Sequence, residues 1–563
     1  MQNFWLLAFP LLKDLKKYSK SLFRKDLIAG LTTAFVLIPQ SMAYAMLAGL
    51  PAHVGLYAAA IPLIPYALLG TSPSLAVGPV AMDSLLTATA LAGMAAIGSD
   101  DYLTLAILLA LMVGSIQFFL GMCRAGFVVN ALSQPVIAGF TAASALIIGF
   151  NQLKHLLGIQ LDQTTAVHTI VLEAVSRWRE IHPPTLIIGF FSISALLLLK
   201  KHKPSLPRTL ILLISGVVIV VSFHLDQKGV TVIGSIPKGL PMPRLPQIQW
   251  SVVQALLPSA ALIALVGFVE AISVAKSLNK PHHQDLRANQ ELAALGLSNI
   301  TSAFYQAFPI SGGFSRSAVN SSAGATSQVA SLITAATVLL TIAFLTPLVT
   351  FVPIVVLGAI IVTAVLSLID IPRVKRFWHI RRSDFWLYCL TFSVTLYFGV
   401  QQGLLAGVFF SLLWFIAATS KPHIAVLGWL EEEGIYRNVE RFPNAQKEPG
   451  ELIIRFDAPL FFANTNYLIN QLKILEEQLE TPLKTVVLDA SGIGRIDATG
   501  AEMLLRIAKE HQARNIRFCL TCLRGPVRDV LTKAGLFEVV PKVNIFLELH
   551  HWHKSHQPLQ KQP

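Results

Sequence analysis

Long apolar runs recur along the first three quarters of this chain, and they constrain its fold more than any other feature. A bilayer core of roughly 30 Å needs about 20 apolar residues per helix, and runs of that length recur between Asp26 and Thr419. Of the 563 residues, 54% are hydrophobic and only 13% are charged, which is too apolar for a soluble protein of this size. We therefore expect an α-helical polytopic membrane protein with about fourteen spans.

The net charge of +13 could suggest nucleic-acid binding, but the basic residues gather at the ends of the predicted spans instead of forming one basic stripe. Their distribution is therefore informative about how the spans are oriented in the membrane. Three clusters fall on one side if the spans alternate, and the positive-inside rule makes that side cytoplasmic. We expect a multi-pass protein of a bacterial inner (plasma) membrane with both termini cytoplasmic. The clusters are Lys13, Lys16, Lys17, Lys20, Arg24 and Lys25; Lys200, Lys201, Lys203 and Arg208; and Arg373, Lys375, Arg376, Arg381 and Arg382. The loop with Lys228, Lys238 and Arg244 is an exception.

The composition changes abruptly after Thr419, where regular charges replace the apolar runs. "LIIRF" (452–456), "TVVLDA" (485–490) and "IRFCLTCL" read as strands, with helices at 498–514 and about 526–534, which predicts a small α/β domain. We divide the chain into a cytoplasmic segment (1–25), a transmembrane domain (26–419), a linker (420–450), the α/β domain (451–550) and a mobile tail (551–563).

The cysteines and the histidine-rich tail give no sign of a metal or cofactor site. Cys519 and Cys522 form a lone CxxC within a predicted strand, where a separation of three puts the side chains on opposite faces. The tail "HHWHKSH" from His550 is expected to be solvated. We expect no metal and no cofactor.

Two interrupted segments stand out within the apolar region: "SLAVGPVAMDSLL" (74–86) and "AFPISGGFSRSAV" (307–319). Each has a short strand-like piece, a Gly/Pro break and small residues that begin a new helix, so both read as half-helices that start within the membrane. Gln40 precedes Pro79 by 39 residues, and Glu270 precedes Pro309 by the same interval. The pattern is typical of transporters built from inverted repeats, here seven spans plus seven.

A half-helix that begins inside the membrane leaves its first N–H groups unpaired and carries partial positive charge, which attracts an anion. Arg316 adds a full charge that is costly in lipid and is seldom there without a function. The hydroxyls of Ser84, Ser311, Ser315 and Ser317 are candidate donors. The alternative is a Gly/Pro kink with small residues for helix packing.

Four further residues are candidates at the same place. Glu270 lies in an apolar span, where it is either a coupling site for H⁺ or Na⁺ or half of a static ion pair with Arg316. Asp83 suits the helix dipole but repels an anion, so we expect it beside the pocket or neutral. Gln40 and Tyr44 share one helix face and either donate to a ligand or fill a helix contact.

These segments resemble the SulP-type anion permeases, the sulfate permease family that includes the animal anion exchangers and prestin. "IPQSMAYAMLAGLPAHVGLY", "LLGTSPSLAVGPVAMDSLL" and "FPISGGFSRSAVNSSAGATSQ" resemble its membrane motifs, and "VVLDASGIGRIDATG" resembles the central loop of its cytoplasmic STAS domain. The resemblance covers nearly the whole chain. It implies a seven-plus-seven inverted repeat in which a transport unit moves against a gate, usually in a homodimer.

The resemblance also implies site residues. The anion pocket would be formed by Gln40, Tyr44, Val80, Ala81, Ser84, Phe314, Ser315 and Arg316, with Glu270 and Asp83 as coupling candidates. Glu270 resembles the acidic residue of proton-coupled members. In the STAS motif, Ala498 replaces the phosphorylatable serine that follows the aspartate in bacterial signalling relatives, here Asp497. Thr499 would then cap or pack the start of the helix. For the STAS domain we expect a trafficking, dimerising or partner-binding role.

We therefore expect a secondary transporter of inorganic anions, with proton-coupled sulfate symport first and bicarbonate, dicarboxylate, Na⁺-coupled transport or anion exchange as alternatives. A nucleobase permease would need acidic or amide groups where Arg316 lies. A sensor is less attractive because no kinase, receiver or DNA-binding sequence follows residue 551. An enzyme is expected least, because no Walker lysine loop, HExxH or GxSxG occurs in a suitable context.

Overall fold

The computed structural model describes residues 9–15, 18–127, 133–161, 167–203, 207–234, 240–278, 286–345, 349–366 and 368–556. Three of the predicted basic positions, Lys16, Lys17 and Lys238, and the tail from residue 557 lie outside the described residues. The chain separates into two compact units, Met1–Ser411 and Leu412–Pro563, each with its own apolar core.

The first unit is helical, and among the described residues eight helical stretches are long and apolar enough to cross a membrane. Its first half contains α2 (Pro10–Leu15), α3 (Lys20–Leu47), α4 (Ala52–Ala58), α5 (Leu63–Leu69), α6 (Ala81–Leu91), α7 (Asp100–Met122), α8 (Gln134–Asn151), α9 (Leu153–Leu157), α10 (Val167–Ser176), α11 (Pro183–His202) and α12 (Arg208–Phe223). Its second half contains α13 (Trp250–Leu278), α14 (Ala288–Phe304), α15 (Phe314–Ser322), α16 (Val329–Phe344), α18 (Ile354–Leu366), α19 (Ile371–Ile380), α20 (Arg382–Phe398) and α21 (Val400–Ser420).

The two interrupted segments form a small sheet inside this unit. Strand β1 (Val77–Gly78) pairs antiparallel with β2 (Ser311–Gly312), and α6 and α15 begin directly after them. Among the described residues, with α4 and α5 counted together, each strand counted with its half-helix, and α2, α9, α10 and α19 left out, the helices give the predicted fourteen spans as seven plus seven. The predicted fold, including both half-helices, is therefore confirmed.

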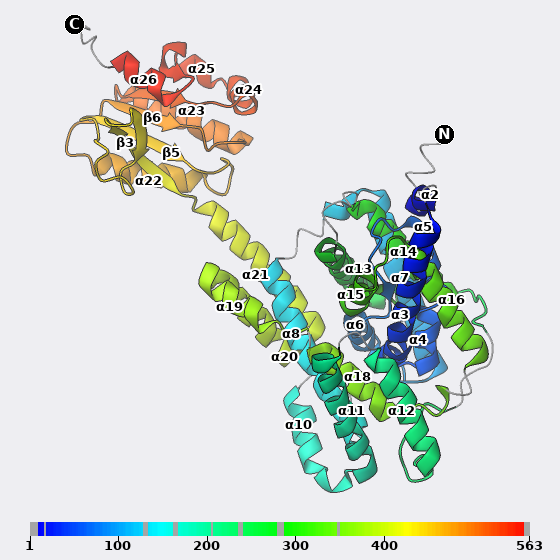
Figure 1. Cartoon of the computed structure of the whole chain (residues 1–563). Helices are drawn as coiled ribbons and strands as arrows, with labels where there is room; N and C mark the ends of the chain where they lie inside the picture. Colours follow the sequence, from blue (N-terminus) through cyan, green and yellow to red (C-terminus); the bar gives the residue numbers. More distant parts are fainter. Residues whose placement is uncertain are drawn as a thin grey trace. The chain divides into compact units, whose positions relative to one another are not determined.

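The helices of this unit pack in two bundles, which we call the α3 bundle (α3–α7 and α13–α16) and the α8 bundle (α8–α12 and α18–α21) (Figure 1). In the first, α7 lies against α14 so closely that a Cβ on Gly296 would be 2.3 Å from the Phe118 nitrogen. In the second, α20 packs on α8 and α11 packs on α18. The bundles meet where α18 contacts α3 and α6 contacts α8.

The second unit is a six-stranded sheet in the order β4-β3-β5-β6-β7-β8. Strands β5, β6, β7 and β8 are parallel, while β3 is antiparallel to both β4 and β5. The strands are β3 (Ile424–Leu430), β4 (Ile435–Asn438), β5 (Glu451–Phe456), β6 (Thr485–Asp489), β7 (Arg517–Thr521) and β8 (Ile545–Phe546). The helices are α22 (Thr465–Glu477), α23 (Ala498–Ala513), α24 (Gly525–Lys533), α25 (Leu536–Val539) and α26 (Leu549–His556).

Three expectations for this unit need correction. The predicted linker 420–450 contains β3 and β4, a hairpin that the charged turn "LEEEG" concealed. The predicted mobile tail is helical as far as His556, because Trp552 is buried on the sheet and His553 stacks on Trp429 with ring centroids 3.7 Å apart. Asp497, and not Thr499, caps α23 by accepting a 2.7 Å hydrogen bond from the Gly500 amide.

Candidate functional site

The amino termini of α6 and α15 meet at the β1–β2 pair. Val80 and Gly313 are the N-cap residues, both have extended backbone, and no described side chain caps either helix. The Gly313 amide donates to the Ala76 carbonyl at 3.1 Å, which ties one half-helix to the strand that precedes the other. Two helix ends with unpaired first-turn amides thus converge from segments far apart in the sequence, and both favour negative charge.

Arg316 lies between these two helix ends and is 1% exposed. Its Nη1 donates to the Pro79 carbonyl at 2.5 Å, whereas Nε and Nη2 are buried with no hydrogen-bond partner among the described residues. A Cβ on Gly313 would lie 2.8 Å from the Arg316 Cζ, so the glycine makes room for the guanidinium. Because an unpaired buried charge is costly, the two free nitrogens identify the place where an anion would be stabilised.

The four candidate serines have different surroundings. Ser84 donates to the Val80 carbonyl at 2.7 Å, and Ser317 accepts from the Ala76 amide at 2.9 Å, so both hydroxyls make contacts within the protein. Ser311 is buried, and its hydroxyl lies beside the Asp83 carboxyl group without a hydrogen bond of normal geometry to a described residue, while Ser315 is exposed in the first turn of α15. Ser311 and Ser315 are therefore the better hydroxyl candidates.

The aromatic and amide candidates lie on both sides of the half-helix ends. Gln40 and Tyr44 are buried on α3, and the Gln40 Oε1 has no partner among the described residues. Tyr44 and Arg316 interact electrostatically. Ala81 is the first residue of α6 and is buried, while Phe314 opens α15 and is 51% exposed. An exposed phenylalanine at a mid-membrane helix end indicates open space beside the site.

Asp83 and Glu270 are both close enough to Arg316 to interact with its charge. Asp83 is buried against α13, where a Cβ on Gly267 would be 3.2 Å from its Oδ2, and its Oδ1 has no partner among the described residues. Glu270 lies nearly one turn further along α13, and its Oε2 is also unpaired. Arg316 and Glu270, both within the described residues, form no salt bridge, so the static ion pair that was the alternative to a coupling site does not form in this structure.

Several polar residues that support the site were not anticipated from the sequence. Asn299 on α14 donates to the Ile310 carbonyl at 2.9 Å and accepts from the Ile310 amide at 2.7 Å, which fixes the residue before β2. Gln117 on α7 accepts from Asn299 at 2.9 Å. The side-chain amides of Gln117 and Asn299, each within an apolar span, were the sequence signal that could have revealed this network.

Two buried carboxylates fix the backbone next to the interrupted segments, one before the first segment and one after the second. Asp26 accepts from the amides and hydroxyls of Thr326 and Ser327, after α15, at 2.6 to 3.3 Å. Glu291 accepts from the Thr71 and Ser72 amides, ahead of β1, at 2.5 and 3.0 Å. Because each carboxylate has several donors, both act as anchors of backbone position.

Comparison with known proteins identifies the same two parts of the chain. Residues 23–391 match the sulfate permease family, and residues 442–551 match the STAS domain. The chain is 35% identical over 562 residues to the chloroplastic sulfate transporter 4.1 of Arabidopsis thaliana, covering 96% of this chain and 81% of that protein. It is 34% identical over 540 residues to a probable sulfate transporter of Mycobacterium tuberculosis, covering 96% of each.

A solved structure is similar over almost the whole chain. The murine solute carrier 26 family member A9, an anion transporter in the inward-facing state, gives a TM-score of 0.91 at 26% identity, covering 99% of this chain and 95% of that one. The family match, the transporter relatives and the shared fold agree with the resemblance predicted from the sequence motifs. This multi-pass membrane protein belongs to the sulfate permease family and carries a C-terminal STAS domain.

Proposed function

We propose that this protein is a secondary active transporter of inorganic anions that carries sulfate together with a proton by alternating access. The observation that carries the proposal is the buried guanidinium of Arg316, with Nε and Nη2 unpaired between two uncapped helix ends. Fixed positive charge and unpaired donors are what a desolvated anion requires. The named sulfate transporters among the relatives support transport and not catalysis.

Sulfate fits this site because it is a tetrahedral dianion that accepts hydrogen bonds on every side. The amides at the starts of α6 and α15, the Ser311 and Ser315 hydroxyls and the Arg316 guanidinium approach from different elements. Gln40 and Tyr44 would line the α3 side, with Val80 and Ala81 at the α6 end and Phe314 at the α15 end. A dianion gains more than a monovalent ion from the same positive field.

Glu270 is our candidate for proton coupling. Its Oε2 is buried and unpaired, and no salt bridge to Arg316 neutralises it within the described residues. A carboxyl group that lacks an ion pair in a membrane interior is stable when protonated, so anion entry beside Arg316 and proton uptake at Glu270 can be linked through charge. Asp83, on α6, interacts electrostatically with Glu270 and would therefore take part in the same link between anion entry and proton uptake.

The proposal also covers membrane orientation, assembly and the part of the protein that moves. We place both termini in the cytoplasm of a cell with a bacterial inner membrane, on the basic clusters that follow α11 and α18. We propose a homodimer and a STAS domain that binds a cytoplasmic partner. The α3 bundle would be the transport unit, because it contains both half-helices, and the α8 bundle would be the gate.

Uptake of labelled sulfate into proteoliposomes tests the proposal. The purified protein is given an inward proton gradient, a Na⁺ gradient or neither, with bicarbonate and succinate as competitors. We expect sulfate uptake that the proton gradient drives and that the competitors do not displace. Bicarbonate or succinate uptake without sulfate uptake would overturn the substrate, and Na⁺-driven uptake or obligatory exchange would overturn proton coupling.

A further inference from the structure

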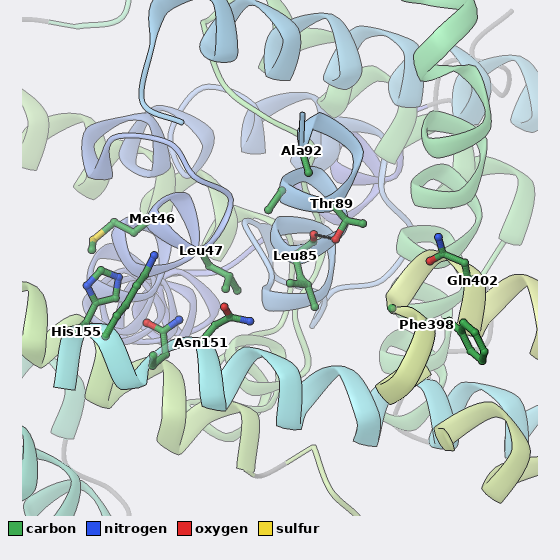
Figure 2. Close-up of a pocket in the computed structure, with 13 residues that line it drawn as sticks. Met46, Leu47, Leu85, Thr89, Ala92, Asn151, His155, Phe398 and Gln402 are labelled. Atoms are coloured by element: carbon green, nitrogen blue, oxygen red, sulfur yellow. Dashed lines mark hydrogen bonds between the residues drawn. The ribbon is translucent and has the colours of Figure 1, made fainter. Parts of the chain in front are cut away.

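A cavity of about 340 Å³ lies beyond the half-helix site, between the two bundles (Figure 2). Met46, Leu47, Leu85 and Thr89 line it from the α3 bundle. The facing wall comes from the end of α8 and from α9, with Asn151 and His155, and from the α20–α21 junction, with Phe398 and Gln402 (Figure 2). We call this cavity the antechamber.

The antechamber lies at the membrane face opposite to the start of α3. Its lining comes from the last turns of α3, α8 and α20, from α6 between Leu85 and its end, and from the first turn of α21, and these parts lie toward one end of alternating spans. That end is the one away from Lys20, where α3 begins. If the basic clusters are cytoplasmic, the antechamber is on the outer side.

The chemistry of the antechamber suits an anion. Lys154 and His155 are adjacent on α9, and Asn151 and Gln152 add amides on the same wall. None of the described residues that line it is acidic, and the Lys154 ammonium group makes no salt bridge or hydrogen bond with a described residue; the Lys154 carbonyl is bonded to the amide of Ile159. An ammonium group without a carboxylate partner at the wall of a partly enclosed cavity leaves a local positive potential.

The size and position of the antechamber connect it to the central site. At about 30 Å³ per water, a cavity of 340 Å³ holds on the order of ten waters, so a small oxyanion fits with part of its hydration shell. Leu85 lies four residues after Ala81, which places the near edge about 6 Å along α6 from the helix end that faces Arg316. The helix α6 therefore lines both the antechamber and the site beside Arg316.

We infer that the antechamber is a second anion-binding subsite, in which Lys154 holds a small oxyanion at the outer end before it reaches Arg316. The inference rests on the proposed anion transport and adds a residue and a location to it. A subsite with one cation and partial hydration would raise the local anion concentration and lower the KM from the outer side, while leaving the central site to determine turnover.

Thiol protection in the full-length protein tests this subsite directly. Thr89→Cys places a reporter in the antechamber, on a Cys123→Ser background that removes an exposed cysteine. A membrane-impermeant thiol reagent is applied to proteoliposomes with sodium sulfate or, at matched ionic strength, sodium gluconate, and modification of residue 89 is followed by peptide mass spectrometry. We expect sulfate to slow modification at least fivefold, and Lys154→Gln to remove the protection.

Three variants separate this inference from the transport proposal. Protection should persist in Arg316→Ala, because the subsite does not need the central guanidinium, and in Lys154→Arg, which keeps the charge. It should also persist in Lys228→Gln, which removes an exposed cation from the loop after α12 at the same end of the unit. We expect Lys154→Gln to raise the KM for outside sulfate about tenfold with little change in maximal rate.

The outcomes that contradict the subsite differ from those that contradict transport. Normal sulfate uptake without protection at residue 89, or equal loss of protection in Lys228→Gln, would overturn the subsite. Loss of protection in Arg316→Ala would also overturn it, because protection would then report occupancy of the central site. Protection without any sulfate uptake would support the subsite and overturn sulfate transport.

Discussion

Arg316 donates a 2.5 Å hydrogen bond to the carbonyl of Pro79, a residue 237 positions earlier in the chain. Pro79 lies between β1 and α6, and Arg316 lies in the first turn of α15, so this bond joins the two half-helices at the point where their positive ends meet. One guanidinium nitrogen is used to fix the geometry, and the two unpaired nitrogens remain for a ligand. The same residue thus has a structural contact and a proposed binding role.

Removal of the Arg316 guanidinium is expected to abolish sulfate uptake. A hydrogen bond to a charged group contributes about 1.5–3 kcal/mol, and loss of two such bonds corresponds to a reduction of at least about 100-fold in affinity. Arg316→Lys should retain part of the activity, because the charge remains but the planar fork of donors is lost. Labelled sulfate binding and uptake are the measurements.

The control for this prediction is Arg179→Ala, which removes an exposed arginine from the same unit. It should leave uptake unchanged. If Arg316→Ala binds sulfate as tightly as the unmodified protein, the anion lies elsewhere. If it binds less but melts at a much lower temperature, the Pro79 contact, and not ligand binding, explains the loss.

Neutralisation of Glu270 should separate sulfate binding from the proton gradient. Glu270→Gln keeps the size of the side chain and mimics the protonated carboxyl, so sulfate binding is expected to remain within about threefold, a difference of less than 1 kcal/mol. Uptake should become insensitive to an imposed proton gradient. The measurement is initial uptake rate against external pH, with Glu180→Gln, an exposed carboxylate, as the matched control. Retained proton-driven uptake in Glu270→Gln would assign coupling to another group.

The sequence could predict the half-helices because their breaks are local. Pro79, Gly312 and Gly313 interrupt apolar runs at matching places, and the chemistry of glycine and proline makes such breaks visible without tertiary information. Arg316 and Glu270 were equally visible, because a charge within an apolar span is unusual. The equal 39-residue intervals from Gln40 to Pro79 and from Glu270 to Pro309 indicated how the two halves pair.

The missed features depend on contacts between distant segments. No local pattern shows that the Ser317 hydroxyl accepts from the Ala76 amide, or that Arg316 turns back toward Pro79. The hairpin of β3 and β4 was missed because its turn is rich in glutamate. The burial of Trp552 depends on a sheet face that forms far away in the sequence.

The STAS domain should become less stable as pH rises from about 5 to 7 because of Glu451. Burial at the start of β5, followed by repulsion from Glu448, raises the pKa of Glu451 from 4.5 to about 7, against an opposing effect of Arg517. Between those two values the folded protein holds a proton that the unfolded chain has released, so the free energy of unfolding falls as pH rises.

Glu451→Gln should remove this pH dependence, because the amide has no proton to lose. The melting temperature of the full-length protein, measured at pH 5 and at pH 8, checks the effect: the variant should gain stability over the unmodified protein at pH 8 and not at pH 5. Glu480→Gln replaces an exposed carboxylate in the same domain. Its melting temperature should differ from that of the unmodified protein by the same amount at pH 5 and at pH 8. A Glu451→Gln variant with an unchanged pH profile would show that this carboxyl is ionised normally in the folded protein.

Replacement of Asp26 should destabilise the transmembrane unit and misplace the end of α15. The carboxylate is fully buried and accepts from Thr326, Ser327 and, at 2.7 Å, from the Tyr18 hydroxyl. Asp26→Ala would leave these buried donors without an acceptor, at a cost of about 3 kcal/mol or more in the free energy of unfolding. Asp26→Asn keeps one acceptor oxygen and should cost less. Melting of the detergent-purified protein measures both, with Asp100→Asn at the exposed start of α7 as the control.

The functional consequence of this anchor distinguishes it from an ordinary core residue. Asp26 holds the backbone just after α15, and the first turn of that helix contains Arg316, so a shift at one end of the helix is transmitted to the other through nine residues. We expect Asp26→Asn to raise the KM for sulfate by several-fold even at temperatures where the protein is fully folded. A variant that melts earlier but transports with an unchanged KM would show that the anchor supports stability alone and that the β1–β2 pair, with the Pro79 contact, is sufficient to position the guanidinium.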